Sequence, residues 1–174
     1  MKVIVINGGA ETGKDKFVKI FRYTSGLRVK NFSSVDKVKN ISEICFGWDG
    51  KKNEKSRKFL SEMKRIWTDF NDGPTNDILN RIEIDTKYCM EKDKDIRKNV
   101  YFLHIREPEE IKKIQKIYGD NCITLIIKKD VEFHPNNSSD QNVDKYEYQY
   151  TIDNNGSLDD LKKNVKQFIK SIKI

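Results

Sequence analysis

The sequence predicts an α/β protein whose strands form one parallel, doubly wound sheet with helices on both faces. Residues 3–6 form a continuous apolar run that is β-branched throughout, as is typical of a strand buried on both sides of a parallel sheet. Four further short runs with the character of strands follow along the chain. Segments with helical spacing of apolar residues separate these runs along the chain. Right-handed crossovers through the helices then make the strands parallel.

The expected elements follow from these patterns in chain order. The strands are expected at residues 3–6, 27–32, 100–105, 121–127 and 146–152. The helices are expected at about 14–23, 35–44, 54–70, 75–90, 108–117 and 158–172, the last with a capping box at its start. The helix at 54–70 has the clearest apolar stripe, which predicts a face packed in the core; it consists of Phe59, Leu60, Met63, Ile66, Trp67 and Phe70.

The length and hydropathy predict one soluble domain covering residues 1–174. No apolar run approaches the roughly 18 residues that a membrane span needs. The first apolar run is also too short for a signal-peptide core. We therefore expect a cytoplasmic protein with no membrane partner, whereas its oligomeric state is not set by the sequence.

The three cysteines, Cys45, Cys89 and Cys122, are far apart and contain no C-x-x-C pair. This pattern argues against a metal site or a disulfide framework. We expect small buried apolar side chains in a reducing compartment.

The net charge of +7 comes from 34 basic and 27 acidic residues. Lysines and acids alternate along most of the chain, which is typical of a solvated surface. A small anionic ligand such as a nucleotide gains from the positive field. Such a ligand is favoured over nucleic acid as the partner.

The chemistry is concentrated in a glycine-rich loop between the first strand and the first helix, with the spacing G-x-x-x-x-G-K. Glycines permit backbone angles that a side chain would block, so that successive amides can surround an anion at the helix N-terminus. A merely tight turn would need neither the lysine nor this register. The loop predicts a nucleoside triphosphate site whose lysine reaches the terminal phosphates, and it reads Gly8-Gly9-Ala10-Glu11-Thr12-Gly13-Lys14, followed by Asp15-Lys16.

Asp15 stands where a serine or threonine hydroxyl normally binds Mg²⁺. A carboxylate there could bind the ion directly or through water. It could instead be a first-turn acid that interacts favourably with the helix dipole. The predicted cofactors are ATP and Mg²⁺, although no base-reading motif separates ATP from GTP.

The stretch at residues 6–15 resembles the Gly-Lys-Asp phosphate loop of phage-type deoxynucleoside monophosphate kinases and animal-type phosphomevalonate kinases. Residues 34–39 look like the acceptor-side segment of that group, and residues 104–111 look like the segment that closes its third strand. The resemblance extends along most of the chain. It implies a three-layer α/β/α P-loop NTPase fold with sheet order 2-3-1-4-5, an acceptor-binding helical segment at about 35–92 and a lid at about 128–145.

The resemblance also implies transfer of the γ-phosphate of ATP to a (deoxy)nucleoside monophosphate. One alternative is a kinase of another phosphorylated metabolite, of the phosphomevalonate or dephospho-coenzyme A type. Another is a nucleotide-binding module with little turnover. Two departures favour the module: Lys16 replaces the usual threonine, and residues 128–145 contain no arginine, although lids of such kinases usually clamp the phosphate with that side chain.

Arg106 and His104 should lie at the carboxyl end of the third strand, above the phosphate loop. Arg106 is the predicted catalytic cation on the γ-phosphate or the acceptor phosphate. Its alternative is an ion pair with Glu109 or Glu110 on the next helix. His104 is expected to be a hydrogen-bonded residue at the strand end rather than a catalyst.

The acceptor side carries further candidates after the second strand. Asp36 is predicted as a general base or a water-mediated Mg²⁺ ligand, with an early-helix acid as the alternative. Lys37, Lys39 and Arg57 could bind the acceptor phosphate or belong to solvated helix faces. Trp48, in a glycine-flanked loop, could stack on an acceptor base.

Overall fold

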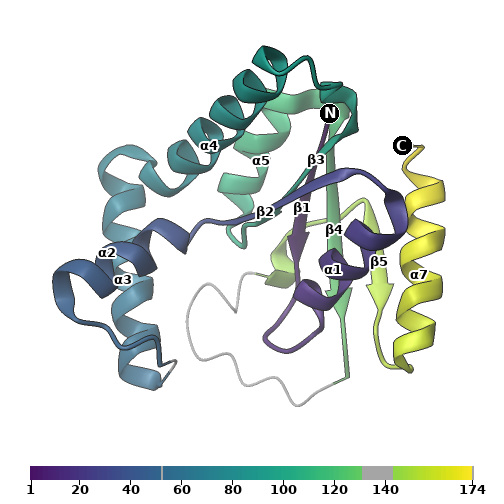
Figure 1. The fold of residues 1–174 in the computed structure, drawn as a ribbon. Coiled ribbons are helices and arrows are strands. Elements are labelled where there is room, and N and C mark those ends of the chain that lie inside the picture. Colours follow the sequence, from purple (N-terminus) through teal and green to yellow (C-terminus); the bar gives the residue numbers. More distant parts are fainter. Residues whose placement is uncertain (52, 131–142, 174) are drawn as a thin grey trace.

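The computed structural model describes residues 1–51, 53–130 and 143–173. Its centre is a five-stranded, all-parallel sheet in the order β2-β3-β1-β4-β5 (Figure 1). The predicted parallel sheet, its helices on both faces and the order implied by the resemblance are confirmed. The strands are β1 (Lys2–Asn7), β2 (Arg28–Ser33), β3 (Asn99–His104), β4 (Cys122–Lys128) and β5 (Tyr150–Asp153).

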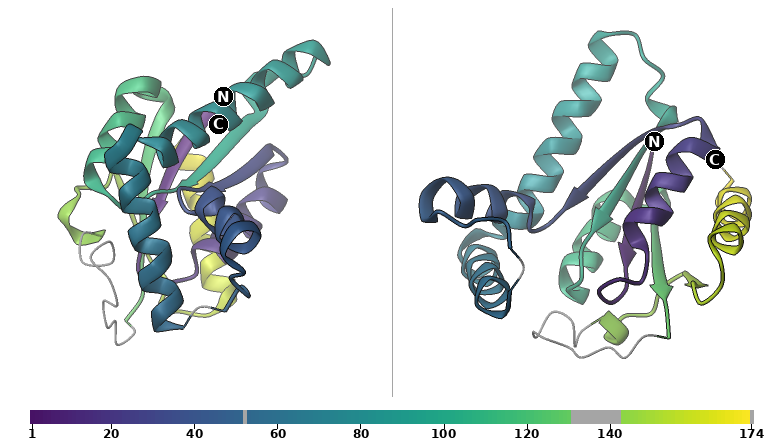
Figure 2. Two further views of the ribbon diagram at one scale, coloured as in Figure 1. Left: turned by 90° about the vertical axis from the view of Figure 1, so that its left-hand side faces the viewer. Right: turned by 60° about the horizontal axis from the view of Figure 1, so that its bottom comes forward.

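One face of the sheet is covered by α1 (Lys14–Ser25) and α7 (Leu158–Ser171) (Figures 1 and 2). Their aromatic rings interlock with the sheet: Phe21 meets Phe102 edge to face with ring centroids 5.0 Å apart, and Phe168 meets Phe17 at 5.6 Å. Edge-to-face pairs of buried rings add to the stabilisation that burial alone provides.

The opposite face is covered by α4 (Gly73–Glu91) and α5 (Pro108–Tyr118). Buried isoleucines of these helices pack on Val3 and Val5, whereas Ile4 and Ile6 face the other layer. Because successive side chains of a strand point to opposite faces, the apolar run of β1 supplies both cores. The isoleucines are Ile78, Ile82, Ile111 and Ile114.

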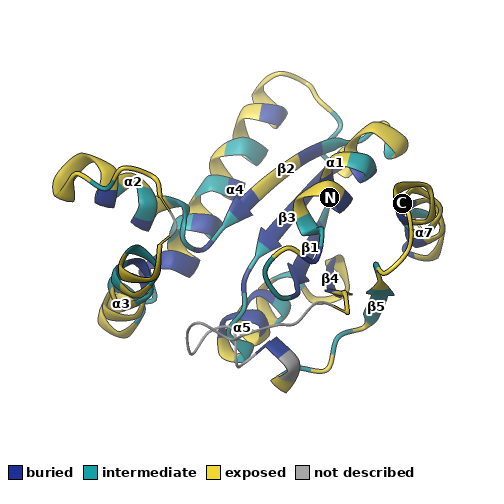
Figure 3. Cartoon of the chain, turned by 90° about the horizontal axis from the view of Figure 1, so that it is seen from below, coloured by how far each residue is buried: buried dark blue, intermediate teal, exposed yellow. Residues whose placement is uncertain are grey.

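Two helices, α2 (Asp36–Phe46) and α3 (Glu54–Asn71), project beyond the β2 edge of the sheet (Figure 2). The prediction that the stripe of α3 packs in the core is wrong for Ile66 and Phe70, towards the end of the helix. Phe70 is 81% exposed and Ile66 is 57% exposed, and Figure 3 shows how much of α3 faces solvent. Leu60 of the stripe is buried as predicted, and Lys64, which lies outside the stripe, is buried beside it, because α3 lies beside the sheet rather than on it.

The other expected elements are confirmed with small differences at their ends, and Ser157 forms the predicted capping box at the start of α7. The fifth strand is shorter than predicted, because Tyr146 and Tyr148 pack against each other before it begins, with ring centroids 4.9 Å apart. The burial prediction is correct for Cys89 and Cys122 but wrong for Cys45, which is exposed. Short 3-10 helices, η1 (Ile96–Lys98), η2 (Gly119–Asn121) and η3 (Val143–Lys145), precede β3, β4 and β5.

In the described part of the chain, no helix is both long and apolar enough to cross a bilayer. β1 lies between β3 and β4, so its carboxyl end is at the middle of the sheet edge where ligands bind in such folds. The loop that follows β1 therefore opens onto that edge.

Candidate active site

The phosphate loop is shaped by backbone angles that only its glycines adopt easily. Gly8 has φ of +139° and Gly13 has φ of +98°. A Cβ on Gly8 would lie 2.3 Å from the carbonyl oxygen of Ile127 in β4, and one on Gly13 would lie 2.4 Å from the side-chain nitrogen of Asn154. Both positions require glycine, for conformation and for space.

Hydrogen bonds inside the loop use its carbonyl groups. The Lys14 ammonium donates to the carbonyls of Gly8 (2.8 Å) and Gly9. The Thr12 hydroxyl also donates to the Gly9 carbonyl, at 3.1 Å, and Asn154 donates to the Thr12 carbonyl at 2.8 Å. Gly13, at the N-cap of α1, supplies no side-chain cap. The amides at the start of α1 are therefore suited to an anionic ligand.

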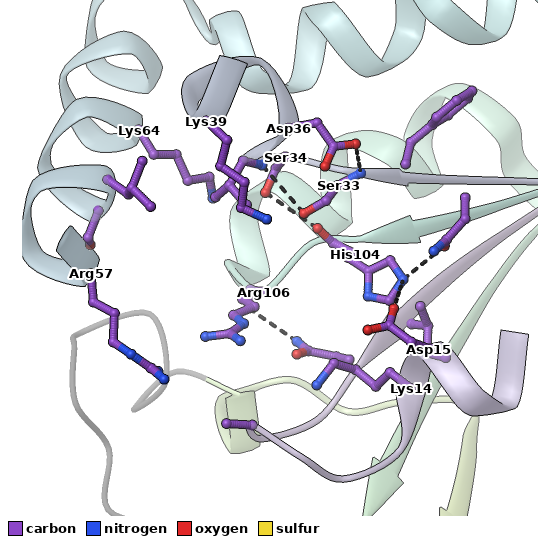
Figure 4. Close-up of a pocket in the computed structure, with 18 of the residues that line it drawn as sticks. Lys14, Asp15, Ser33, Ser34, Asp36, Lys39, Arg57, Lys64, His104 and Arg106 are labelled. Carbon is purple, nitrogen blue, oxygen red and sulfur yellow. Dashed lines mark hydrogen bonds and ion pairs between the residues drawn. The ribbon is translucent and has the colours of Figure 1, made fainter. Parts of the chain in front are cut away.

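A pocket of about 580 Å³ opens beside this loop, between the ends of β2 and β3 and the helices α2 and α3 (Figure 4). It is of a size that fits small molecules. Most of the predicted site residues line this one space, although they come from four separate segments of the chain. Those residues are Ala10, Glu11, Lys14, Asp15, Asp36, Lys39, Arg57, His104 and Arg106.

Like charges converge across the pocket. Burial lowers the pKa of Lys14 to about 8, and the charge of Arg106 lowers it as well. Burial likewise lowers the pKa of Arg106; the Glu107 carboxylate opposes this shift, and the charge of Arg57 adds to it. Three cations on different elements thus act on one another in a partly desolvated space, and an anion bound among them would offset their repulsion.

Asp36 is held at the start of α2. Its Oδ2 accepts hydrogen bonds from the Ser33 amide (2.8 Å) and from Arg81 of α4 (3.1 Å). The Arg81 guanidinium also lies over the Phe32 ring, 4.1 Å from its centroid. Asp36 is therefore an acid in the first turn of a helix, as the alternative to a catalytic role predicts. It also lines the pocket.

His104 is neutral near pH 7, because burial lowers its pKa to about 4 despite the opposing effect of Asp15. Its Nε2 lies 2.8 Å from Oδ1 of Asn31 on β2. A neutral ring with the proton on Nε2 donates that bond. His104 is thus a hydrogen-bonded residue at the end of β3.

Asp15 presents a carboxylate that is 92% exposed, with Oδ1 3.8 Å from His104 Nε2. Protein Mg²⁺ sites commonly use one or two carboxylates together with substrate phosphates and water. One exposed carboxylate next to Lys14 fits that requirement. The described residues contain no group of three or more His, Cys, Asp and Glu that could hold a metal ion.

Other predicted residues lie away from this space. Lys16 and Lys37 are exposed, and neither they nor Trp48 line the pocket. The Trp48 indole donates to the Lys51 carbonyl at 3.0 Å. Residues 131–142 of the expected lid lie outside the described residues.

Sequence reasoning missed the ion pair behind the pocket. Lys64 Nζ of α3 lies 2.9 Å from Glu110 Oε2 of α5, and the side chains are only 10% and 4% exposed. Lys64 stands one helical turn after Leu60, which is the available signal that it faces inward. Nothing local could pair it with a residue 46 positions away. The two acids proposed as alternative partners of Arg106 pair with lysines: Glu109 with Lys112 and Glu110 with Lys64.

The sheet order and the helical layers define a three-layer α/β/α fold. Two solved structures share this fold. A gluconokinase from Sinorhizobium meliloti 1021 has a TM-score of 0.52 and 11% identity, covering 98% of this chain and 93% of that chain. Thymidylate kinase from Candida albicans has a TM-score of 0.50 and 13% identity, covering 99% of this chain and 92% of that chain.

At these identities the likeness shows the fold alone. No protein-family model matches the sequence. The curated proteins likewise contain no significant match to it. The pocket therefore provides the evidence on the chemistry.

Proposed function

We propose that the chain is an ATP-dependent phosphotransferase that moves the γ-phosphoryl group of ATP to a small phosphorylated acceptor. The observation that carries this proposal is the convergence of Lys14, Arg106 and Arg57 on one pocket at the mouth of the phosphate loop (Figure 4). Phosphoryl transfer depends mainly on positioning and on neutralising charge. A pocket with cations on both sides of the transfer point supplies both.

The loop amides and Lys14 would hold the nucleotide phosphates, with Asp15 as one ligand of the accompanying Mg²⁺. In the transfer, an acceptor oxygen forms a bond to the γ-phosphorus. The bond from that phosphorus to the β,γ-bridging oxygen breaks, and ADP leaves with that oxygen. Arg106 would stabilise the charge on the transferring group.

The identity of the attacking oxygen decides where a proton goes. A phosphate oxygen of the acceptor attacks without losing a proton. A hydroxyl must lose one, and Asp36 is the carboxylate at the acceptor side of the pocket that would accept it. In the proposal Asp36 is needed only for a hydroxyl acceptor.

The resemblance predicts a (deoxy)nucleoside monophosphate as acceptor and another phosphorylated metabolite as the alternative. Both would bring a phosphate to Arg57 and Arg106. A binding module with little turnover is the third possibility. It differs from both kinases in one observable: MgATP would bind, yet no acceptor would increase ADP release.

The test is ADP release from MgATP, measured with a panel of nucleoside monophosphates and non-nucleotide phosphorylated metabolites. We expect at least one acceptor to raise the rate above that of ATP alone, and Arg106→Ala to lower the stimulated kcat by about 100-fold, a loss of about 2.7 kcal/mol of transition-state stabilisation. Arg97→Ala is the matched control, since Arg97 is an exposed arginine paired with Asp95. A wild-type protein that binds MgATP but responds to no acceptor would contradict transfer and support the module.

A further inference from the structure

We propose that Asn7 is a positioning residue of the phosphotransferase site, which holds the phosphate loop and the main chain of Arg106 at a fixed spacing, and that Tyr148 supports it. The inference rests on the proposed function and adds residues to the same site. It follows from the hydrogen bonds of the Asn7 carboxamide, which join three segments at one sheet edge: the phosphate loop, the residues after β3 and the residues before β5.

Asn7 is a polar residue at the end of an apolar strand. It is the last residue of β1, directly after the apolar run at residues 3–6, and it is only 1% exposed. It also lines the pocket beside the phosphate loop. Burial of a carboxamide is unfavourable unless its donors and acceptor are hydrogen-bonded. The partners of this side chain therefore explain its position.

The carboxamide uses its oxygen and its nitrogen in different directions. Its Oδ1 accepts a hydrogen bond from the Gly8 amide at 2.8 Å. Its Nδ2 donates to the Tyr148 hydroxyl at 2.5 Å and to the Arg106 carbonyl at 3.4 Å, the longest of the three bonds; Figure 4 marks this last bond by the dashed line at Arg106. Both hydrogens of Nδ2 are thus donated, and Oδ1 is occupied as well.

These partners allow only one orientation of the Asn7 carboxamide. A backbone amide can only donate and a carbonyl can only accept, so Oδ1 must face Gly8 and Nδ2 must face Arg106. Tyr148 agrees with this direction, because its hydroxyl accepts from Asn7 and donates to the carbonyl of buried Val143 at 3.1 Å. A flipped carboxamide would lose the bonds to both Gly8 and Arg106.

The two backbone groups that Asn7 holds belong to the two parts of the proposed transfer site. Gly8 begins the loop that would bind the ATP phosphates, and its φ of +139° sets the direction of that loop. Arg106 follows the end of β3 and carries the guanidinium that would stabilise the transferring group. A shift of about 1 Å between such groups can lower a rate about 100-fold. Asn7 would therefore act on catalysis through the placement of Arg106 relative to the loop.

A pair of neighbouring tyrosines provides the first test, which needs no acceptor. Tyr148→Phe removes the hydroxyl that supports Asn7. Tyr146→Phe is the matched control, because its hydroxyl bonds to Gln115 of α5 at 2.5 Å and both variants keep the ring pair. Hydrogen exchange of the Gly8 amide is measured by NMR on the nucleotide-free protein. We expect exchange at least fivefold faster in Tyr148→Phe and within twofold of the parent in Tyr146→Phe. Unchanged exchange in Tyr148→Phe would overturn the support by Tyr148.

The second test is a double-mutant cycle on the rate of ADP release with an acceptor from the panel. Tyr148→Phe should lower kcat about tenfold and leave the KM for ATP within twofold of the parent, while Tyr146→Phe changes neither. In the Arg106→Ala background, Tyr148→Phe should lower kcat by less than twofold, because the side chain that it positions is absent. An equal loss of kcat in both backgrounds would show a general structural effect and would overturn the positioning role.

Asn7→Asp tests the carboxamide itself. The substitution keeps the shape of the side chain and an acceptor for the Gly8 amide, but it removes both hydrogens of Nδ2. We expect kcat to fall at least tenfold, and an unchanged kcat would overturn the proposal. If this variant does not fold, the tyrosine pair still decides. A panel without any active acceptor would refute the phosphotransferase proposal and the catalytic role with it, whereas the exchange of the Gly8 amide still decides whether Tyr148 and Asn7 hold the loop.

Discussion

The phosphate loop and the α2–α3 region form the two sides of one pocket, yet they are built in different ways. The loop side comes from seven consecutive residues whose glycines fix the backbone, and its lysine folds back on its own carbonyls. The α2–α3 side comes from single side chains spread over several elements, and a buried ion pair links it to α5. The first can be recognised from spacing alone, whereas the second depends on the complete fold.

The largest effect on stability should come from breaking the Lys64–Glu110 ion pair between α3 and α5. Lys64→Ala leaves Glu110 as a buried, uncompensated charge, whose Oε1 already lacks a hydrogen-bond partner among the described residues. Loss of one partner of a buried pair costs about 3–5 kcal/mol, and we expect that decrease in the free energy of unfolding, measured in urea. Lys112→Ala, which breaks an exposed pair, should cost less than about 1 kcal/mol. Equal effects of the two substitutions would contradict a structural role for the buried pair.

The loop side should be sensitive to its backbone instead. Gly8→Ala places a methyl group against the Ile127 carbonyl in a conformation with positive φ. We expect a loss of about 1–3 kcal/mol of stability from strain and a loss of MgATP binding of at least tenfold by calorimetry. Gly26→Ala is the control: its φ of +66° carries strain, but nothing lies within 4 Å of the added carbon, so binding should persist. Normal MgATP binding by Gly8→Ala would refute the requirement for glycine at this position of the loop.

Protonation of Lys14 gives the loop side a pH dependence. In the free protein its pKa is about 8, whereas a bound triphosphate favours the charged form and raises that pKa. Binding therefore takes up a proton above pH 8, and the Kd for MgATP should rise by up to about tenfold per pH unit there. Below pH 8 this dependence should disappear. Lys14→Arg should flatten the profile between pH 8 and 9.5, and a parent profile that is already flat would contradict the lowered pKa.

The smallest effect is expected on the solvent face of α3. Phe70 is 81% exposed, so Phe70→Ala should change the free energy of unfolding by less than about 0.5 kcal/mol. Phe168→Ala on α7 removes a buried ring, 3% exposed, and should cost about 3–5 kcal/mol. Comparable losses in the two variants would show that the stripe of α3 is buried in solution.

The difference between the loop side and the α2–α3 side explains which features could be predicted from the sequence. The central strands β1, β3 and β4 are apolar at successive positions, so the fold class follows from local patterns. The loop with Lys14 follows from spacing. The burial of the α3 stripe was predicted incorrectly in part, because amphipathic periodicity indicates a helix and its apolar face. It does not indicate which neighbouring element covers that face. The pairing of Lys64 with Glu110 joins residues distant in the chain, and a single sequence contains no signal for it.

The central claim is that the amides and the lysine of the phosphate loop bind a triphosphate. The measurement is a calorimetric titration of MgATP into the parent chain, Lys14→Ala and Lys19→Ala, whose substituted lysine is exposed on α1. The account predicts that Lys14→Ala raises the Kd by about 100-fold, as expected for loss of a charge-assisted contact worth about 2–3 kcal/mol, and that Lys19→Ala matches the parent. If Lys14→Ala binds MgATP as tightly as the parent does, the account is contradicted.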